Sequence, residues 1–119
     1  MEKILVVADN HGDHCCQRTI DAVLQFKADF KPHHLIHLGD CYDFTSLRSG
    51  ASAEEKSMNG KDDFDKGCEF LKEFFKGKAK SKEFMWGNHD WRIVQAMEST
   101  SGITSDYAEY IFKDIKRLF

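Results

Sequence analysis

The chain has 119 residues, which is the size of one domain or of part of one. Hydrophobic residues make up 41% and aromatic residues 13%, so the composition is that of a globular protein and excludes an intrinsically disordered chain. The formal net charge of −3, from 17 basic and 20 acidic residues, excludes an overall basic field that would drive non-specific binding of nucleic acid.

The first third of the chain is expected to form a strand followed by a helix. Residues 3–8 are a short, β-branched apolar run, which is typical of a strand buried on both faces. A turn cluster follows, and Asp13 is placed to cap a helix that Pro32 ends. That helix carries an apolar stripe at helical spacing, made by Cys16, Ile20, Val23 and Leu24.

The middle of the chain is expected to hold a second strand, a polar loop and a second helix. The strand spans residues 34–38 and stops at a Gly-Asp pair. Residues 46–63 predict a loop or a loosely held short helix, the most flexible stretch. The overlapping charge-rich segment from 54 to 66 predicts a solvated face. The helix that follows has an apolar side made by Phe64, Cys68, Leu71 and Phe75.

The last third is expected to hold a third strand and two helices. The strand spans residues 83–86, and one helix runs from 91 to about 98. The final helix has one face made by Tyr107, Ile111, Ile115 and Leu118. Strands and helices thus alternate, which predicts an α/β fold: a parallel sheet with flanking helices and right-handed crossovers.

The four cysteines and the apolar runs indicate the setting of the protein. No Cys-x-x-Cys pair occurs, and the adjacent Cys15 and Cys16 are a poor arrangement for structural zinc, so reduced thiols are expected. No run approaches the roughly 20 apolar residues of a membrane span, and no signal peptide is recognisable. We therefore expect a cytoplasmic protein without a membrane partner.

A polar cluster follows each expected strand, at residues 9–13, 39–43 and 87–90. The carboxyl ends of parallel strands lie on one edge of a sheet, where open α/β sheets bind their ligands, so the clusters are expected to converge. Their carboxylates, two imidazoles and an amide oxygen suit Mn, Fe or Zn better than Ca. Each cluster alone is a common turn, but all three in order at strand ends predict metal-dependent hydrolysis.

The three motifs, Asp-x-His, Gly-Asp-x-x-Asp and Gly-Asn-His-Asp, occur in this order in the calcineurin-like metallophosphoesterases, which the chain resembles over essentially its whole length. It looks most similar to the small phosphoesterase-like proteins of phages and bacteria. The resemblance implies the N-terminal half of a four-layer αββα sandwich, with residues 1–119 forming one incomplete domain. It also implies two divalent metal ions, with Mn favoured, and hydrolysis of a phosphomonoester or phosphodiester by a metal-bridging hydroxide.

The resemblance further implies roles for individual residues. Asp9 and His11 would bind the first metal ion, Asp40 would bridge both ions, and Asn88 would bind the second through its amide oxygen. His89 would act beside the scissile phosphate as general acid or as a stabiliser of the transition state. The residue that would orient this imidazole is Asp43.

Other residues have weaker claims on the site. Arg48 and Arg92 follow the second and third motifs and could clamp the substrate phosphate, although a solvated surface arginine fits each equally well. His14 is expected to have a capping or surface role. We interpret His37 as structural, because we expect it away from the carboxyl end of the second strand.

The ligand set is incomplete, because family members carry further histidines after the third motif and none follows His89 here. The chain is a fragment of a longer protein, a short form that borrows ligands from a partner or second copy, or a degenerate relative. The last would be a non-catalytic or single-metal binding module.

A flavodoxin-like phosphate or nucleotide binder is a third class of function, but no glycine-rich phosphate loop supports it. The sequence implies a phosphoester substrate without identifying it; net charge gives no support to nucleic acid or nucleotide, and the oligomeric state stays open.

Overall fold

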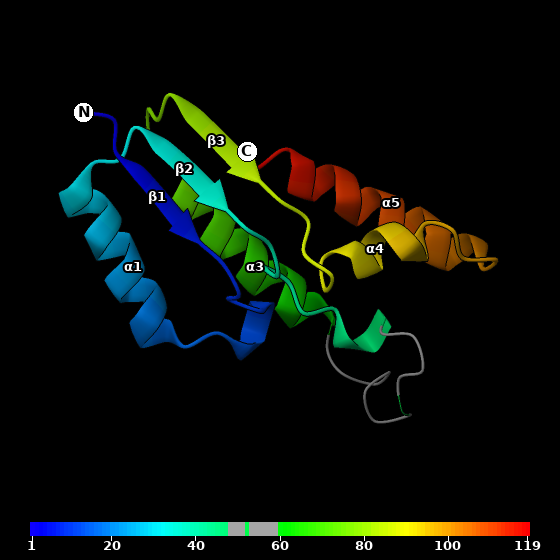
Figure 1. The fold of residues 1–119 in the computed structure, drawn as a ribbon. Helices are drawn as coiled ribbons and strands as arrows, with labels where there is room; N and C mark the ends of the chain where they lie inside the picture. The colour runs from blue at the N-terminus through cyan, green and yellow to red at the C-terminus, as the bar shows by residue number, and fades with distance from the viewer. Residues whose placement is uncertain (48–51, 53–59) are drawn as a thin grey trace.

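A three-stranded parallel sheet forms the centre of the computed structural model, which describes residues 1–47, 52 and 60–119 (Figure 1). The strands are β1 (Ile4–Val7), β2 (His34–His37) and β3 (Ser81–Phe84), in the order β1-β2-β3. Both neighbouring pairs are parallel. The predicted α/β fold, a parallel sheet with flanking helices, is confirmed.

The helices are α1 (Gln17–Phe30), α3 (Gly60–Phe75), α4 (Trp91–Ala96) and α5 (Gly102–Lys116), with short 3₁₀ turns η1 (Gly12–His14) and η2 (Thr45–Leu47). Most of the polar loop expected at residues 46–63 lies outside the described residues, and so does the stretch predicted to be flexible. The last four residues of this range begin α3. None of the described helices is long and apolar enough to span a bilayer.

The third strand and the first helix begin at other residues than predicted. The third strand lies two residues earlier than expected, because ladder pairing begins with the polar Ser81 opposite His34 rather than with the apolar run. The first helix begins at Gln17, with Cys16 as its N-cap. Asp13 instead lies in η1, where the amide of residue 15 donates to the carbonyl of Gly12 and closes a separate 3₁₀ turn.

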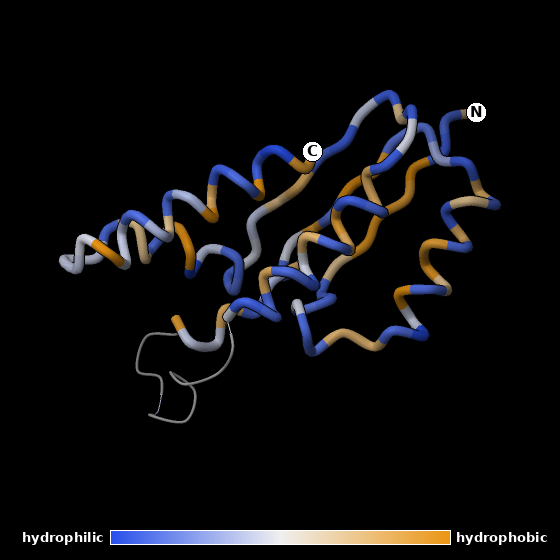
Figure 2. Tube along the Cα trace, turned by 180° about the vertical axis from the view of Figure 1, so that it is seen from behind, coloured by the Kyte–Doolittle hydropathy of each residue, from blue (hydrophilic) through white to orange (hydrophobic). Residues whose placement is uncertain are grey.

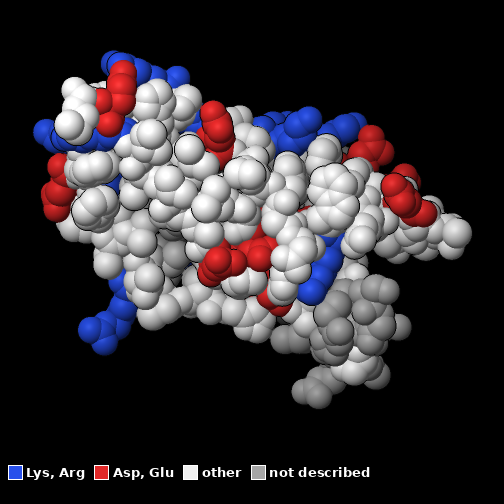
Figure 3. Space-filling view, viewed as in Figure 1, with Lys and Arg blue, Asp and Glu red and all other residues white. Residues whose placement is uncertain are grey.

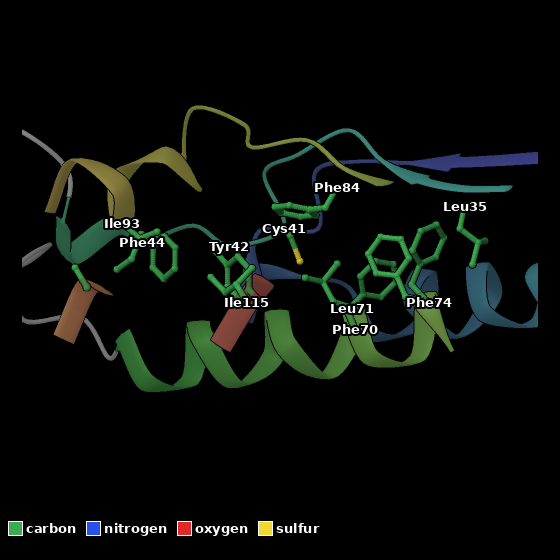
Figure 4. Packing of buried hydrophobic residues seen from close by; sticks show 12 residues of the cluster. Leu35, Cys41, Tyr42, Phe44, Phe70, Leu71, Phe74, Phe84, Ile93 and Ile115 are labelled. Carbon is green, nitrogen blue, oxygen red and sulfur yellow. The ribbon is translucent and has the colours of Figure 1, made fainter. Parts of the chain in front are cut away.

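The core lies between the sheet and α3. Phe70, Leu71 and Phe74 project from α3 toward Leu35 and Phe84 of the strands (Figure 4). Rings stack along the helix, with centroids 5.6 Å apart for Phe70 and Phe74. The predicted amphipathic helix is confirmed, although its buried side is wider than the four expected residues because Phe70 and Phe74 join it.

The final helix buries most of the predicted face, because Ile115 is fully buried and Ile111 and Leu118 pack against the core. Ala108 and Ile115 are buried, whereas Tyr107 is 68% exposed. Ring contacts join this region to the sheet, with Phe112 stacked 5.0 Å from Trp86. The predicted face is therefore wrong only at Tyr107, next to which Ala108 is the buried residue.

The face of the sheet opposite α3 is uncovered by the described part of the chain. Ile4, Val6, Leu38 and Met85 are 53%, 46%, 49% and 55% exposed. In parallel strands, residues paired in register point to the same side and alternate along the strand, so these four lie on one face of the sheet. The trace coloured by hydropathy shows the hydrophobic run of β1 (Figure 2). The expectation that the first strand is buried on both faces is therefore wrong, because the helices cover only one face of it.

His37 is the last residue of β2 and is fully buried, so its expected place away from the carboxyl end of the strand is wrong. Its Nε2 donates to Asn10 Oδ1 at 2.7 Å, and its Nδ1 accepts from the amide of Gly39 at 3.0 Å. These two bonds require the neutral ring with its proton on Nε2. Burial lowers the pKa of His37 to about 4, and the nearby charge of Asp40 opposes the shift only weakly.

The buried imidazole predicts an acid-sensitive fold. The unfolded chain binds a proton at His37 below about pH 6.5, whereas the folded chain does so only near pH 4. The stabilisation from His37 is therefore complete above pH 6.5 and is lost as the pH falls to 4, by about 3 kcal/mol. Urea unfolding across this range should show a smaller loss in His37→Gln than in wild type, since all other titrating groups are shared.

The matched control is His33→Gln, whose imidazole is half-exposed. It should lose as much stability as wild type over the same range. An equal pH dependence of wild type and His37→Gln would show that the buried ring is not the acid-sensitive group.

Candidate metal centre

The three polar clusters meet at the carboxyl edge of the sheet. Backbone amides of the first cluster donate to carbonyls of the second, from Asp9 to Gly39 at 3.0 Å and from His11 to Asp40 at 2.9 Å. The third cluster joins through the amide of His89, which donates to Asp40 Oδ1 at 2.9 Å. Acidic side chains gather at this edge, with a basic side chain beside them (Figure 3).

The buried carboxylate of Asp90 joins the second cluster to the third through hydrogen bonds to backbone amides. Its Oδ2 accepts from the amides of Asp40 at 2.7 Å and Gly87 at 2.9 Å, and its Oδ1 accepts from the amide of Tyr42 at 2.9 Å. Burial raises the pKa of Asp90 to about 6, and the three N–H groups oppose that rise. This role is not predictable from the sequence pattern, in which the only signal is the acidic residue that closes the third motif.

Two glycines let the backbones of these clusters touch. A Cβ at Gly39 would lie 2.5 Å from the amide nitrogen of Gly87, and Gly39 has a φ of 111°. A Cβ at Gly87 would lie 2.3 Å from Asp40 Oδ1. The approach therefore requires glycine at both positions.

A second buried carboxylate, Asp63, supports the first two clusters from α3. It accepts from the amides of Asp43, at 2.9 Å, and Phe44. A Cβ at Gly12 would lie 1.7 Å from its Oδ1, which explains the glycine of the first cluster. Burial raises the pKa of Asp63. The expected solvated face of residues 54–66 is wrong at this position, because Asp63 is 4% exposed.

Three candidate ligands have left-handed backbones. The φ angles of Asp9, His11 and Asp40 are 61°, 50° and 54°. Such angles are unfavourable for residues with a Cβ and occur mostly where the surrounding structure imposes them. The hydrogen bonds between clusters impose them here, and they aim the three side chains at one place.

Asp9, His11 and Asp40 form the first group that could hold a metal ion, because their ligand atoms lie within 4.8 Å of one another. His11 Nε2 lies 3.5 Å from Asp9 Oδ1, while its Nδ1 donates to Asp43 Oδ1 at 3.1 Å. A carboxylate that holds one ring nitrogen leaves the lone pair of the other free to face a metal ion. Two carboxylates and one such imidazole fit a divalent transition metal.

Asp43 organises a second group with His11 and His89. Its Oδ1 accepts from Nδ1 of both imidazoles, at 3.1 Å and 3.0 Å, and the rings meet edge to face with centroids 4.8 Å apart. Its Oδ2 accepts from the hydroxyl of Thr45 and lies 3.6 Å from His14 Nε2. His14, expected to have a capping or surface role, therefore also faces this carboxylate.

The remaining site residues differ in how closely they join the cluster. Arg92 Nη1 donates to the carbonyl of Asp43 at 2.8 Å, so its guanidinium is anchored beside the site. Asn88 is exposed in the loop that carries His89, and among the described residues no hydrogen bond joins its side chain to the other candidate ligands. Arg48 lies outside the described residues.

An α/β fold with carboxylates and imidazoles at the carboxyl edge of a parallel sheet defines a class of candidate metal-dependent hydrolases. The family model for calcineurin-like phosphoesterases matches residues 2–117, and the chain belongs to that family. This membership implies a hydrolase of phosphoester bonds, and the family normally binds divalent metal ions. Searches of curated proteins and of solved structures each returned no match.

The role of Asp90 predicts a large loss of stability on its truncation. Asp90→Ala removes the acceptor of three amides, and each buried donor left without a partner costs about 1–3 kcal/mol. We expect a loss of at least about 3 kcal/mol in the free energy of unfolding, measured by urea denaturation at pH 7. Asp106→Ala, at an exposed position of α5, is the control and should stay within about 0.5 kcal/mol of wild type. A similar effect of both changes would contradict this account.

Proposed function

We propose that the chain forms the metal-binding and proton-transferring part of a divalent-metal-dependent phosphoester hydrolase, acting on a phosphomonoester or a phosphodiester. The observation that carries the proposal is the carboxylate of Asp43, which holds His11 on one side and His89 on the other. His11 also belongs to the group with Asp9 and Asp40, whereas His89 does not. The family match gives the reaction class.

The chain's own residues divide between two metal positions. Asp9, His11 and Asp40 would hold the first ion, and Asp40 with Asn88 would hold the second in the complete enzyme. Oxygen donors with a single imidazole favour Mn over Fe and Zn. When bound, such ions neutralise charge on the phosphoryl oxygens and lower the pKa of water.

His89 is proposed as the general acid. Its Nδ1 donates to Asp43, so the ring orientation is fixed and Nε2 is the atom that can pass a proton to the leaving oxygen. The same carboxylate accepts from His11, so the metal position and the acid are held by one group. Arg92, anchored on the carbonyl of Asp43, is the proposed clamp for the substrate phosphate, and Arg48 stays a candidate from the sequence alone.

The second candidate function is a single-metal or non-catalytic binding module. The two groups of three possible ligands among the described residues share His11, so only one of them can use that imidazole at a time, which is the specific observation in its favour. A catalytic centre of the two-metal type needs both ions to clamp the attacking and leaving oxygens.

Removal of the proposed acid should lower turnover without removing metal. We expect His89→Ala to reduce the rate of Mn²⁺-dependent hydrolysis of a chromogenic phosphodiester by about 10²–10⁴-fold, the usual contribution of general acid catalysis. The control is His34→Ala, whose ring bonds to Ser81 on the opposite edge of the sheet and should leave the rate near wild type. Equal rates for wild type and His89→Ala would refute the assignment of the acid.

Metal titration by calorimetry tests the metal position and can exclude the single-metal module. One tight Mn²⁺ site that Asp9→Asn weakens strongly, with no second tight site, is expected for the half-centre that this chain supplies. Two tight sites would exclude the single-metal module. The control is Asp106→Asn, which lies on α5 and should bind Mn²⁺ as wild type does. Unchanged binding in Asp9→Asn would place the ion elsewhere.

A further inference from the structure

Two imidazoles converge on one carboxylate oxygen in the candidate site. His11 Nδ1 lies 3.1 Å and His89 Nδ1 lies 3.0 Å from Asp43 Oδ1, and the three ligand atoms all lie within 4.8 Å of one another. Ligands at ordinary Zn–N and Zn–O bond lengths of about 2.0–2.2 Å, set at tetrahedral angles, are roughly 3.4 Å apart. Both nitrogen–oxygen pairs are thus within about 0.4 Å of the separation between two ligands of one zinc ion.

The donor set of this group suits a different ion from that of the group with two carboxylates. Two imidazoles and one carboxylate favour Zn²⁺, whereas mainly oxygen donors favour Mn²⁺. Three protein ligands with a fourth position open to solvent are a common arrangement for zinc. The side chains of His11, Asp43 and His89 are 29%, 15% and 26% exposed, so an ion can reach the group from solvent.

The carboxylate of Asp43 is already oriented for such an ion. Its Oδ2 accepts from the hydroxyl of Thr45, and its backbone amide donates to Asp63 at 2.9 Å. The guanidinium of Arg92 donates to the carbonyl of Asp43, which leaves Oδ1 to the two rings. An ion that replaces the two Nδ1 protons therefore meets a ligand whose position is fixed from three other directions.

The ring of His11 lies between two carboxylates, so either of its nitrogens can carry the proton. Its Nδ1 faces Asp43, and its Nε2 lies 3.5 Å from Asp9 Oδ1. With the proton on Nδ1, the lone pair of Nε2 serves the group with Asp9 and Asp40. With the proton on Nε2, Asp9 can accept it and Nδ1 serves the group with His89. A neutral imidazole has one free lone pair, so an ion in one group excludes an ion in the other.

We propose that His11, Asp43 and His89 form an inhibitory zinc site, which competes with the first metal position for His11. Zn²⁺ takes Nδ1 of both rings in place of a proton; in a neutral ring this proton moves to Nε2, and a charged ring releases it to water. The zinc site rests on the geometry of the three side chains. Its inhibitory role rests on the proposed function, because the ion takes His11 from the first metal position and replaces the contact that orients His89.

The first experiment locates the protons on the rings and needs no activity. Imidazole nitrogens are followed by ¹⁵N NMR while Zn²⁺ is titrated into metal-free protein that carries Cys15→Ser and Cys16→Ser, because accessible thiols also bind zinc. We expect zinc to replace the Nδ1 proton of His89 and to leave a proton on Nε2. The control is the buried ring of His37, which should not change. Saturation with Zn²⁺ while His89 keeps its Nδ1 proton would overturn the proposal.

Calorimetry on the same background separates the two metal positions. His89→Gln should lower the affinity for Zn²⁺ by about 100-fold or more, because losing a ligand costs more than losing an outer partner, and should leave Mn²⁺ binding unchanged. Asp9→Asn should weaken Mn²⁺ strongly but Zn²⁺ by at most about tenfold, since Asp9 only accepts the Nε2 proton of the zinc-bound ring.

The matched control is His33→Gln, because this imidazole lies 3.3 Å from the carboxylate of Glu2, far from the site in the sheet. It should bind both ions as the parent does. A loss of Zn²⁺ binding in His33→Gln, or an undiminished Zn²⁺ affinity in His89→Gln, would place the zinc ion elsewhere and refute the site.

The inhibitory role is tested on the Mn²⁺-loaded protein with the chromogenic phosphodiester. One equivalent of Zn²⁺ should abolish turnover, and excess Mn²⁺ should restore it, because both ions need His11. Turnover that depends on His89 but survives saturation with Zn²⁺ would leave the hydrolase standing and refute the inhibitory site alone. Zinc bound at His89 in a protein without His89-dependent turnover would refute the hydrolase and with it the inhibitory role.

Discussion

The carboxylate of Asp90 is the constraint on which the site depends. It accepts three backbone amides from two loops that are about 50 positions apart in the chain, and it does so without any exposure to solvent. Water cannot replace those bonds in a buried place, so the loops cannot separate without leaving donors unpaired. The close approach of Gly39 and Gly87 follows from this, and so does the position of Asp40 between them.

A second carboxylate, that of Asp43, orients the side chains of the site, and its own backbone is held by a hydrogen bond to α3. Its amide is bound by Asp63 of α3, and its side chain then gathers the imidazoles of His11 and His89. The site thus depends on successive hydrogen bonds. The buried carboxylate of Asp63 holds the backbone at Asp43, and the Asp43 carboxylate in turn orients the two imidazole rings. Such support is the usual means of keeping ligands in one orientation before a metal ion arrives.

The sequence predicted the fold class and the meeting of the three motifs, because apolar periodicity and strand ends are local signals. It did not reveal Asp63, since a lone Asp in a charged segment resembles solvated surface until the packing of α3 beneath Gly12 is known. Nor did it predict the uncovered face of the sheet: Ile4 and Val6 are as apolar as any core strand, and only the placement of α1 and α3 on one side exposes them. The roles of Asp9, His11, Asp40, Asn88 and His89 stay proposals, because residue type and proximity define a possible site and not its chemistry.

The left-handed backbone at Asp9, His11 and Asp40 has a consequence for the history of such a chain. Each of these conformations costs about 1 kcal/mol for a residue with a Cβ, and glycine would remove that cost. Under selection for stability alone, drift would replace these three residues with glycine or asparagine before it touched the apolar core. Stability alone therefore gives no reason for these three positions to keep aspartate and histidine side chains.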